Sequence, residues 1–268
     1  MREYILGFIG AGNMSQAIIS GAIDKKVVKS DKIFVFDIDD TKMKALRETS
    51  GTKLASSAKA LSEVCDIIVL AVKPNVLPKV LDEIKEAAHG KTFVSIAAGW
   101  NADRIKSIVG EDQKVIRLMP NTPLKVGEGM SVFESPSNAD KDVLAFVQGM
   151  FGALGKVEHA PNKLMHAVTA VSGSGPAYVF MFIDALSDAG VLCGLPRDMS
   201  TTLATQTVLG GAKMVQDTGT HPGVLKDAVC SPGGTTIEAV KSLEDDGFRG
   251  SIISAVQKCA DKSKKLAK

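Results

Sequence analysis

The sequence predicts an α/β protein in which an N-terminal Rossmann-type, doubly wound sheet precedes a C-terminal all-α domain. Three observations support this fold class. Short apolar segments alternate with helical patterns up to about residue 160, the first apolar segment leads into a glycine-rich turn, and only helical patterns follow. With 268 residues, of which 45% are hydrophobic, the chain can form one large domain or two smaller ones with buried cores.

Short strands and helices alternate in the first part of the chain. The segment 67–72 is continuously apolar, as expected for a strand of a parallel sheet that is covered on both faces. The expected strands are 4–9, 32–36, 67–72, 92–96 and 115–119, with edge strands at 130–133 and 156–158. The expected helices between them are 13–24, 40–49, 74–88 and 101–108.

Helical spacing alone continues after residue 160. The expected helices are 162–170, 177–193, 197–216, 223–229, 235–244 and 251–265, separated by breaks that contain Gly or Pro. We therefore expect two domains, 1–160 and 161–268. The segment 168–192 is apolar on most faces, more than a helical domain of about 110 residues covers by itself, so we expect a dimer or larger assembly.

Composition and charge argue against several classes of protein. The formal net charge is +2 and aromatic residues make up 5%, which disfavours nucleic-acid binding. The four cysteines form no Cys-x-x-Cys pair and no histidine stands at ligand spacing, so we expect no metal site and a reduced, cytoplasmic protein. The uncharged run 164–183 approaches the length of a membrane span. Its Gly/Ser/Pro break at 172–176 and the following Asp184 favour a buried, interrupted helix, and we expect no membrane contact.

The glycine-rich turn after the first strand predicts a dinucleotide site. Gly10 permits the tight turn and Gly12 lets the backbone approach a pyrophosphate, while the helix N-terminus at Asn13 and Met14 faces its charge. Ser15 stands where a third glycine or alanine is usual. The alternative is a glycine turn in an α/β protein that binds no cofactor.

Asp37 ends the second strand, where a carboxylate can accept hydrogen bonds from the adenosine ribose hydroxyls. The alternative is an aspartate that caps the next helix. Asp39 and Asp40 lie close by, and the group of carboxylates should repel a 2′-phosphate unless Lys42 or Lys44 folds back to offset it.

Three further loops follow strands at the carboxyl edge of the expected sheet, where ligands bind in open α/β folds. Together they suggest a crevice lined by backbone. The residues we expect to contact the cofactor there are Ala71, Val72, Lys73, Pro74, Ala97, Ala98, Gly99 and Asn121.

The segment 231–237 suits a small anion. Ser231 offers a hydroxyl, Gly233 and Gly234 let backbone N–H groups point into one concavity, and Thr235 and Thr236 begin a helix. Successive free N–H groups at a helix start bind a carboxylate or phosphate. The alternative is a glycine-rich helix cap with nothing bound.

These motifs together resemble the pyrroline-5-carboxylate reductase family over essentially the whole chain. The matching blocks are 7–14, 71–74, 119–123, 171–178 and 221–237. The first block is shared with many dehydrogenases, whereas the last block is the signature of the family and is highly specific.

The resemblance implies an oxidoreductase that reduces 1-pyrroline-5-carboxylate to L-proline by hydride transfer from NADPH or NADH, the last step of proline biosynthesis. It assigns dinucleotide binding to 1–160, and substrate binding and dimerisation to 161–268. It also implies interlocked dimers, as such or as a decamer. The family commonly favours NADPH, but Asp37 departs from the residues usual there, so we expect NADH to be used better than is typical.

The resemblance also implies roles for single residues. Thr236 would hydrogen-bond the ring nitrogen and act in catalysis. The substrate would contact Ser231, Gly233, Gly234, Thr235, Thr236 and Ser174. His166 and His221 are expected to be structural.

Two other functions remain open at this stage. A related imine or β-hydroxyacid dehydrogenase shares the two-domain plan, but the hydroxyacid enzymes need a lysine on the central helix, and 177–188 has none. A dinucleotide sensor without chemistry would not need the second anion site at 231–236.

Overall fold

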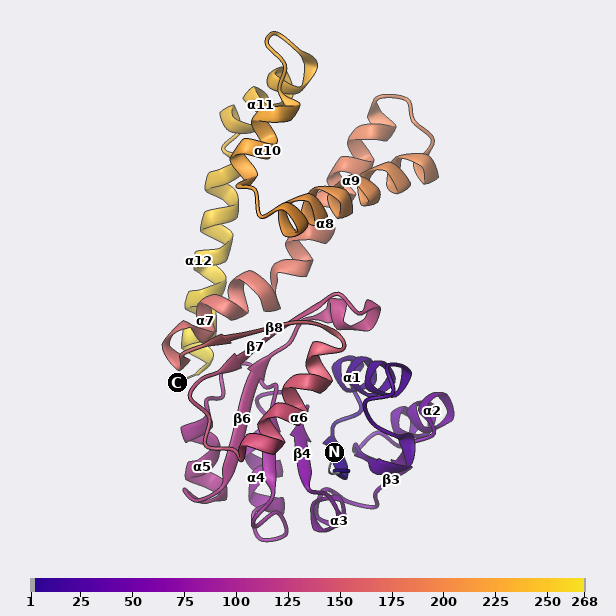
Figure 1. The fold of residues 1–268 in the computed structure, drawn as a ribbon, viewed down its shortest axis with the longest axis vertical. Helices are drawn as coiled ribbons and strands as arrows, with labels where there is room; N and C mark the ends of the chain where they lie inside the picture. Colours follow the sequence, from indigo (N-terminus) through magenta and orange to yellow (C-terminus); the bar gives the residue numbers. More distant parts are fainter. Residues whose placement is uncertain (1–2, 268) are drawn as a thin grey trace. The chain divides into compact units, whose positions relative to one another are not determined.

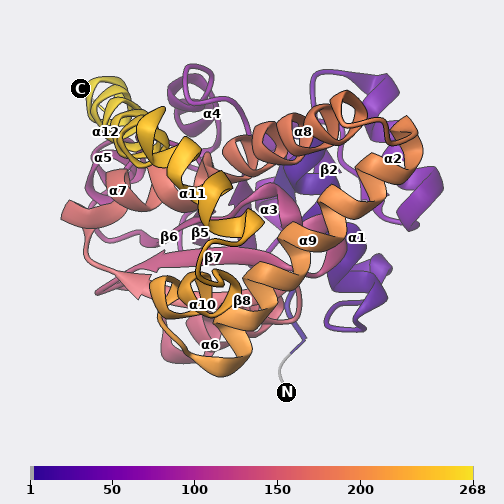
Figure 2. The same ribbon diagram turned by 90° about the horizontal axis from the view of Figure 1, so that it is seen from above.

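The computed structural model describes residues 3–267, and the chain divides into two compact units (Figures 1 and 2). Unit 1 comprises Met1–Ser174 together with Cys259–Lys268, and unit 2 comprises Gly175–Lys258. The last helix therefore begins in unit 2 and ends in unit 1.

Unit 1 contains an eight-stranded sheet in the order β3-β2-β1-β4-β5-β6-β7-β8. All neighbouring strands are parallel except β6 and β7, which are antiparallel. The strands are β1 (Leu6–Ile9), β2 (Ile33–Phe36), β3 (Lys53–Leu54), β4 (Ile67–Leu70), β5 (Thr92–Ser95), β6 (Lys114–Met119), β7 (Gly129–Glu134) and β8 (Gly155–Ala160). The strand order reverses between β1 and β4, which is the position where doubly wound sheets bind ligands.

Helices cover both faces of this sheet. They are α1 (Asn13–Asp24), α2 (Asp40–Ser50), α3 (Ala58–Val64), α4 (Leu77–Ile84), α5 (Ala102–Val109) and α6 (Lys141–Gly152). Successive residues of β4 point to opposite faces: Val69 joins a cluster with α1, α2 and α6, and Ile68 joins a cluster with α3, α4 and α5. The continuous apolar run of β4 is thus explained by burial on both sides, and the predicted fold class is confirmed.

The structure differs from the sequence prediction in several elements of unit 1. Helices α3 and α6 and the short strand β3 were not predicted. The expected edge strand at 130–133 lies inside the sheet, because β7 pairs with both β6 and β8. The helix expected at 74–88 spans only Leu77–Ile84.

Only helices follow β8 in the part of the chain that the structure describes. They are η3 (Asn162–Leu164), α7 (Met165–Val168), the π-helical η4 (Thr169–Gly173), α8 (Gly175–Leu192), α9 (Arg197–Thr218), α10 (Pro222–Val229), α11 (Thr235–Asp245) and α12 (Phe248–Leu266). The change from alternating elements to helices falls at residue 160.

The compact units nevertheless divide at residues 174 and 175, not at the predicted boundary of 160 and 161. Met165 is fully buried in a cluster with Met119, Val132 and Ala160, which joins α7 to the last strands of the sheet. The end of α12 returns to the same unit, where the Ser263 hydroxyl lies 2.9 Å from Nδ1 of His166. Burial and hydrogen bonding therefore keep residues 161–174 with the sheet.

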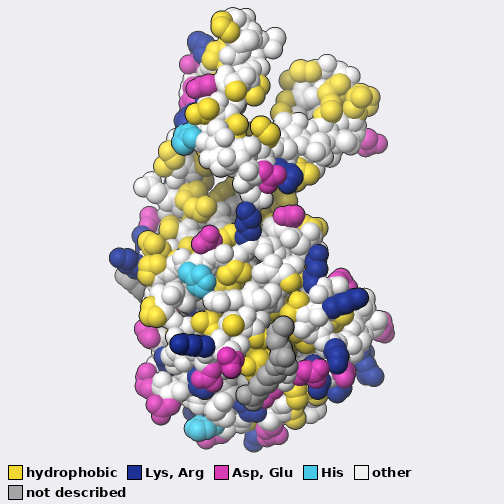
Figure 3. Space-filling view, viewed as in Figure 1, with side chains coloured by type: hydrophobic (Ala, Val, Ile, Leu, Met, Phe, Trp, Pro, Cys, Tyr) yellow, Lys and Arg dark blue, Asp and Glu magenta, His cyan; other side chains and the backbone are white. Residues whose placement is uncertain are grey.

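In unit 2, α8 and α9 lie side by side (Figures 1 and 2). Helix α8 was expected to be buried, but Phe180 is 61% and Met181 is 72% exposed in the single chain. Figure 3 shows hydrophobic side chains over the helices of unit 2. Among the described residues, the helical stretch Asn162–Leu192 has the length and composition of a membrane span, which a helix at a protein interface also has.

Candidate active site

The glycine turn connects β1 to α1 in the geometry that a dinucleotide requires. Gly10 has a φ of +108°, and a Cβ there would lie 2.6 Å from the carbonyl oxygen of Ala71, so only glycine fits. Gly12 is the N-cap of α1 and has an extended backbone without a side-chain cap. The first N–H groups of α1, at Asn13 and Met14, are therefore open to an anion such as a pyrophosphate.

Ser15 occupies the third glycine position as a fully buried residue. Its hydroxyl has no hydrogen-bond partner among the described residues. A buried side chain of this size is compatible with the close packing of helix against strand that the third position of such a turn requires.

Asp37 holds the glycine turn in place. Its Oδ2 accepts a hydrogen bond from the N–H of Ala11 at 2.7 Å, and its Oδ1 accepts one from Asp39 at 3.0 Å. Each oxygen keeps a second lone pair, so the carboxylate can still accept a ribose hydroxyl. The helix cap that we considered as an alternative for Asp37 is supplied by Asp39, which accepts from Thr41 and Lys42.

Lys42 forms an ion pair with Asp39. Its Nζ lies 3.1 Å from Oδ2 of Asp39, and the pair raises the pKa of Lys42 and lowers that of Asp39. Lys42 therefore offsets the charge of Asp39, and the nearby carboxylate of Asp37 also contributes to the raised pKa of Lys42.

The three loops at the carboxyl edge follow β4, β5 and β6 as expected. Ala71 and Val72 are half-buried and Lys73 and Pro74 are exposed, while Ala97 is buried beside Gly99 in the loop after β5. The backbone N–H of Ala71 donates to the carbonyl of Ile9, so this loop starts directly beside the glycine turn.

Asn121 uses its side chain within the protein. Its Oδ1 accepts from the N–H of Met130 at 2.8 Å, and its Nδ2 donates to the carbonyl of Ser172 at 3.2 Å. This buried amide ties the loop after β6 to β7 and η4. Any contact of Asn121 with a cofactor would have to come from its backbone or from the remaining amide hydrogen.

In unit 2, residues 231–236 form an open helix N-terminus. Gly233 has a φ of +65°, and a Cβ on Gly234 would lie 2.2 Å from Oγ of Ser231. Gly234 is the N-cap of α11 without a side-chain cap, so the N–H groups of Thr235 and Thr236 keep no capping side chain. Thr235 is exposed and Thr236 is half-buried, and the local geometry can bind a carboxylate.

Ser174 belongs to unit 1, whereas the other expected substrate residues belong to unit 2. Its hydroxyl accepts a hydrogen bond from the thiol of Cys259 at 3.2 Å.

His221 caps α10, because its Nδ1 accepts from the N–H of Gly223 at 3.1 Å. Burial, together with the charges of Arg117 and Lys264, lowers the pKa of His166.

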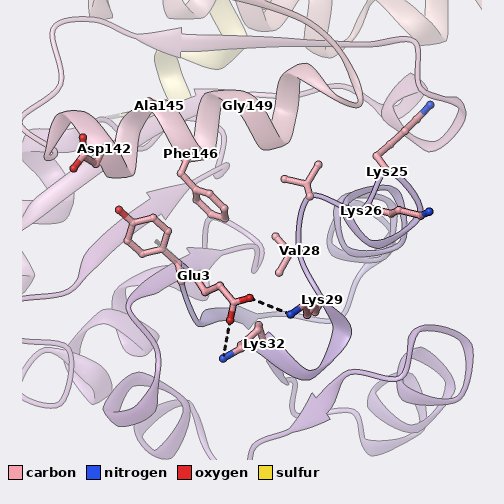
Figure 4. A pocket seen from close by; sticks show the side chains of 12 residues that line it. Glu3, Lys25, Lys26, Val28, Lys29, Lys32, Asp142, Ala145, Phe146 and Gly149 are labelled. Atoms are coloured by element: carbon pink, nitrogen blue, oxygen red, sulfur yellow. Dashed lines mark hydrogen bonds and ion pairs between the residues drawn. The ribbon is translucent and has the colours of Figure 1, made fainter. Parts of the chain in front are cut away.

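A hollow of about 840 Å³ lies elsewhere in unit 1. It is lined by Glu3, Lys29, Lys32 and Phe146, and Glu3 forms ion pairs with both lysines (Figure 4). Glu3 lies just before β1, whereas the glycine turn lies just after β1. The hollow is therefore at the end of the strands opposite the glycine turn. Among the described residues, no group of three His, Cys, Asp or Glu side chains could hold a metal ion.

Comparison with known proteins decides the family. Residues 162–266 match the family model described as pyrroline-5-carboxylate reductase dimerisation, and residues 5–99 match one described as NADP oxidoreductase, coenzyme F420-dependent. The pyrroline-5-carboxylate reductase of Escherichia coli (strain K12) is 46% identical over 267 residues, which are 99% of each chain. The chain belongs to the pyrroline-5-carboxylate reductase family.

Other members of the pyrroline-5-carboxylate reductase family agree over the full length. The enzyme of Arabidopsis thaliana is 42% identical and is matched over 99% of this chain and 96% of its own. A crystal structure of the Plasmodium falciparum pyrroline carboxylate reductase with NADP bound superimposes with a TM-score of 0.92, at 35% identity over the whole of both chains. The resemblance inferred from the motifs is thereby confirmed.

Proposed function

We propose that this protein reduces 1-pyrroline-5-carboxylate to L-proline with NADH or NADPH. Family membership over 99% of the chain is the observation that carries the proposal. The substrate is a cyclic imine that bears a carboxylate, and the geometry offers a site for each charged part of the reaction: an open helix N-terminus at α11 and a dinucleotide turn at α1.

Unit 1 binds the dinucleotide in this proposal. The N-terminus of α1 faces the pyrophosphate, Asp37 accepts from the adenosine ribose, and the loops 71–74 and 97–99 hold the nicotinamide. When bound, NADH or NADPH supplies the hydride that adds to the carbon of the C=N bond. The protein contributes by holding the substrate and the cofactor in the relative orientation that hydride transfer requires.

The N-terminus of α11 binds the substrate. Backbone N–H groups of Thr235 and Thr236 and the hydroxyl of Ser231 hold the carboxylate, and Gly233 and Gly234 leave room for it. The Thr236 hydroxyl hydrogen-bonds the ring nitrogen and so orients the C=N carbon toward the cofactor, with Ser174 lining the same site. A substrate that enters protonated at nitrogen needs no side-chain acid, in keeping with the structural contacts of His166 and His221.

The helical region supplies self-association. Residues 162–266 match a dimerisation model. The apolar side chains of α8 and α9 that are exposed in the single chain are suited to packing against a second copy of the chain. We propose an interlocked dimer, as such or within a decamer, located in the cytoplasm and without metal, nucleic-acid or membrane partners.

The decisive experiment is turnover of the purified protein with 1-pyrroline-5-carboxylate, followed by the loss of reduced-nicotinamide absorbance and by the formation of proline. A related imine or β-hydroxyacid dehydrogenase would show turnover only with other substrates. A dinucleotide sensor would bind NADH or NADPH without oxidising it.

A further inference from the structure

The two loops assigned to the nicotinamide are joined by a tryptophan. Trp100 directly follows the loop 97–99 and is 4% exposed. Its indole Nε1 donates a hydrogen bond to the carbonyl of Pro74 at 3.1 Å. A buried, rigid side chain of one loop therefore fixes the backbone of the other loop.

Arg104 covers this tryptophan. Its guanidinium carbon lies 4.1 Å from the centroid of the Trp100 ring, a cation–π geometry that gains strength when the groups are shielded from water. The position of Arg104 is itself fixed, because its backbone N–H donates to Oδ1 of Asn101, the N-cap of α5, at 2.8 Å.

The end of α12 completes the cluster. Nη1 of Arg104 donates to the carbonyl of Ala267 at 3.1 Å. The carbonyl oxygen of Leu266 would lie 3.2 Å from a Cβ placed on Gly99, so the end of α12 packs directly against the turn of the second loop. Three parts of the chain thus meet: the loop after β4, the loop after β5 with the start of α5 that directly follows it, and the end of α12.

We propose that Trp100 and Arg104 are positioning residues that set the spacing of the two nicotinamide loops, and that the end of α12 holds Arg104 in place for this purpose. The inference rests on the proposed function, because it takes the two loops as the nicotinamide site. None of the hydrogen bonds and ring contacts described above reaches Asp37 or the glycine turn, so we expect the cluster to act on the nicotinamide half of the cofactor more than on the adenosine half.

The test compares two ligands that differ only in the nicotinamide. Equilibrium binding of NADH is measured against ADP-ribose, and binding of NADPH against 2′-phospho-ADP-ribose, in the full-length wild type and in Arg104→Ala, Arg104→Lys and Trp100→Phe. Trp100→Phe keeps an aromatic ring beneath Arg104 but removes the donor to Pro74. Lys106→Ala removes a cation from the same helix and is the matched control.

We expect Arg104→Ala and Trp100→Phe to weaken binding of the reduced dinucleotide about tenfold and to leave binding of the ADP-ribose form within about twofold of wild type. Arg104→Lys should recover part of the loss, because it keeps the charge over the ring but not the planar fork. In steady-state kinetics, the KM for the cofactor should rise more than the KM for pyrroline-5-carboxylate.

Two results would overturn the inference. Equal behaviour of Arg104→Ala and Lys106→Ala would remove the positioning role. Equal weakening of both ligands, together with a lower thermal midpoint, would show that the cluster serves folding only. If the wild type bound neither ligand, the proposed function would fall as well, and turnover of the wild type distinguishes that case.

Discussion

In unit 1, side chains such as Phe8, Phe93 and Phe133 are completely withdrawn from solvent, whereas in unit 2 Phe180 and Met181 of α8 are mostly exposed. Among the described residues of unit 2, Ala204 is the only buried apolar side chain. The difference teaches that unit 1 has a buried core of its own, whereas unit 2 leaves its apolar side chains exposed in the single chain, in keeping with its match to a dimerisation model.

The largest effect is expected when a charge is placed on the exposed face of α8, because this tests whether unit 2 depends on a second chain. Phe180→Asp would bury a carboxylate twice in a symmetric dimer, at a cost of several kcal/mol for each unpaired charge. We expect loss of the dimer at micromolar concentration and a drop in activity of at least about a hundredfold. Light scattering and turnover measure the two effects.

Val64→Asp is the matched control for that substitution, because Val64 is an exposed valine of α3 in unit 1. This variant should remain a dimer and keep its activity. A fully active monomer of Phe180→Asp would refute the view that unit 2 depends on a second chain.

A second prediction contrasts an ion pair inside unit 1 with one on unit 2. Nη1 of Arg117 lies 2.5 Å from Oε2 of Glu134, with both side chains almost inaccessible. Glu134→Gln would leave the buried guanidinium without its counter-charge and should reduce the free energy of unfolding by about 3–5 kcal/mol.

The exposed ion pair of Lys241 and Asp245 on α11 is the control. Because solvent screens this pair, Asp245→Asn should change the free energy of unfolding by less than about 1 kcal/mol. Denaturant unfolding of both variants provides the measurement.

The third prediction separates the proposed substrate site of unit 2 from the proposed cofactor site of unit 1. Thr236→Ala should slow turnover roughly ten- to a hundredfold, as expected for losing a hydrogen bond to a charged group, with little change in cofactor affinity. Thr236→Ser should restore most of the rate. Unchanged catalytic efficiency in Thr236→Ala would remove the residue from the mechanism.

The fourth prediction concerns cofactor choice in unit 1. The carboxylate of Asp37, which forms no ion pair closer than 4 Å with a described residue, should favour the 2′-hydroxyl of NADH over a 2′-phosphate by roughly 1–3 kcal/mol, or about ten- to a hundredfold. Asp37→Ser should therefore shift the ratio of catalytic efficiencies toward NADPH. It should also lower the efficiency with both cofactors, because Ala11 loses its acceptor. A wild type that strongly prefers NADPH, with the same ratio in the variant, would contradict the electrostatic argument.

The smallest expected effect is on pH dependence. The pKa of His166 is lowered in the folded protein, chiefly by burial, so the unfolded chain takes up a proton more readily. The contribution of neutral His166 to the free energy of unfolding should be fully present above the ordinary histidine pKa of about 6.5. It should be lost as the pH drops below that value. Thermal midpoints of wild type and His166→Gln across that range should converge at low pH, whereas parallel curves would exclude His166 as the cause.

Local patterns were sufficient to predict most of the fold. The apolar run of β4 and the glycine turn at Gly10 carry their signal within a few neighbouring residues. Helix α3 has seven residues, about two helical turns, and β3 has two residues, so both are too short for their apolar pattern to repeat often enough to be recognised. The π-helical segment Thr169–Gly173 reads in the sequence as a break because of its Gly and Ser residues.

The parts of the candidate site that lie within a local motif could be predicted from the sequence. The contacts between residues that are distant in sequence could not. The sequence shows that Asp37 ends a strand, but not that the N–H of Ala11 points at its carboxylate. It contains no signal that Trp100 reaches Pro74, or that Arg104 reaches a carbonyl at the end of α12. The apolar pattern of 168–192 indicated that a second chain has to cover it, but apolar periodicity does not say which side chains meet that chain.

The return of α12 to unit 1 has a consequence for synthesis. Three contacts close the nucleotide-binding unit across the chain: Ser174 with Cys259, His166 with Ser263, and Arg104 with Ala267, the last pair 163 residues apart in sequence. Domains commonly fold as they leave the ribosome, N-terminal part first. Here the sheet can form early, but the contacts of Arg104 with α12 must wait until the helices of unit 2 have been translated. The loops 71–74 and 97–99, which we propose hold the nicotinamide, therefore reach their final form only after the helices of unit 2 are available.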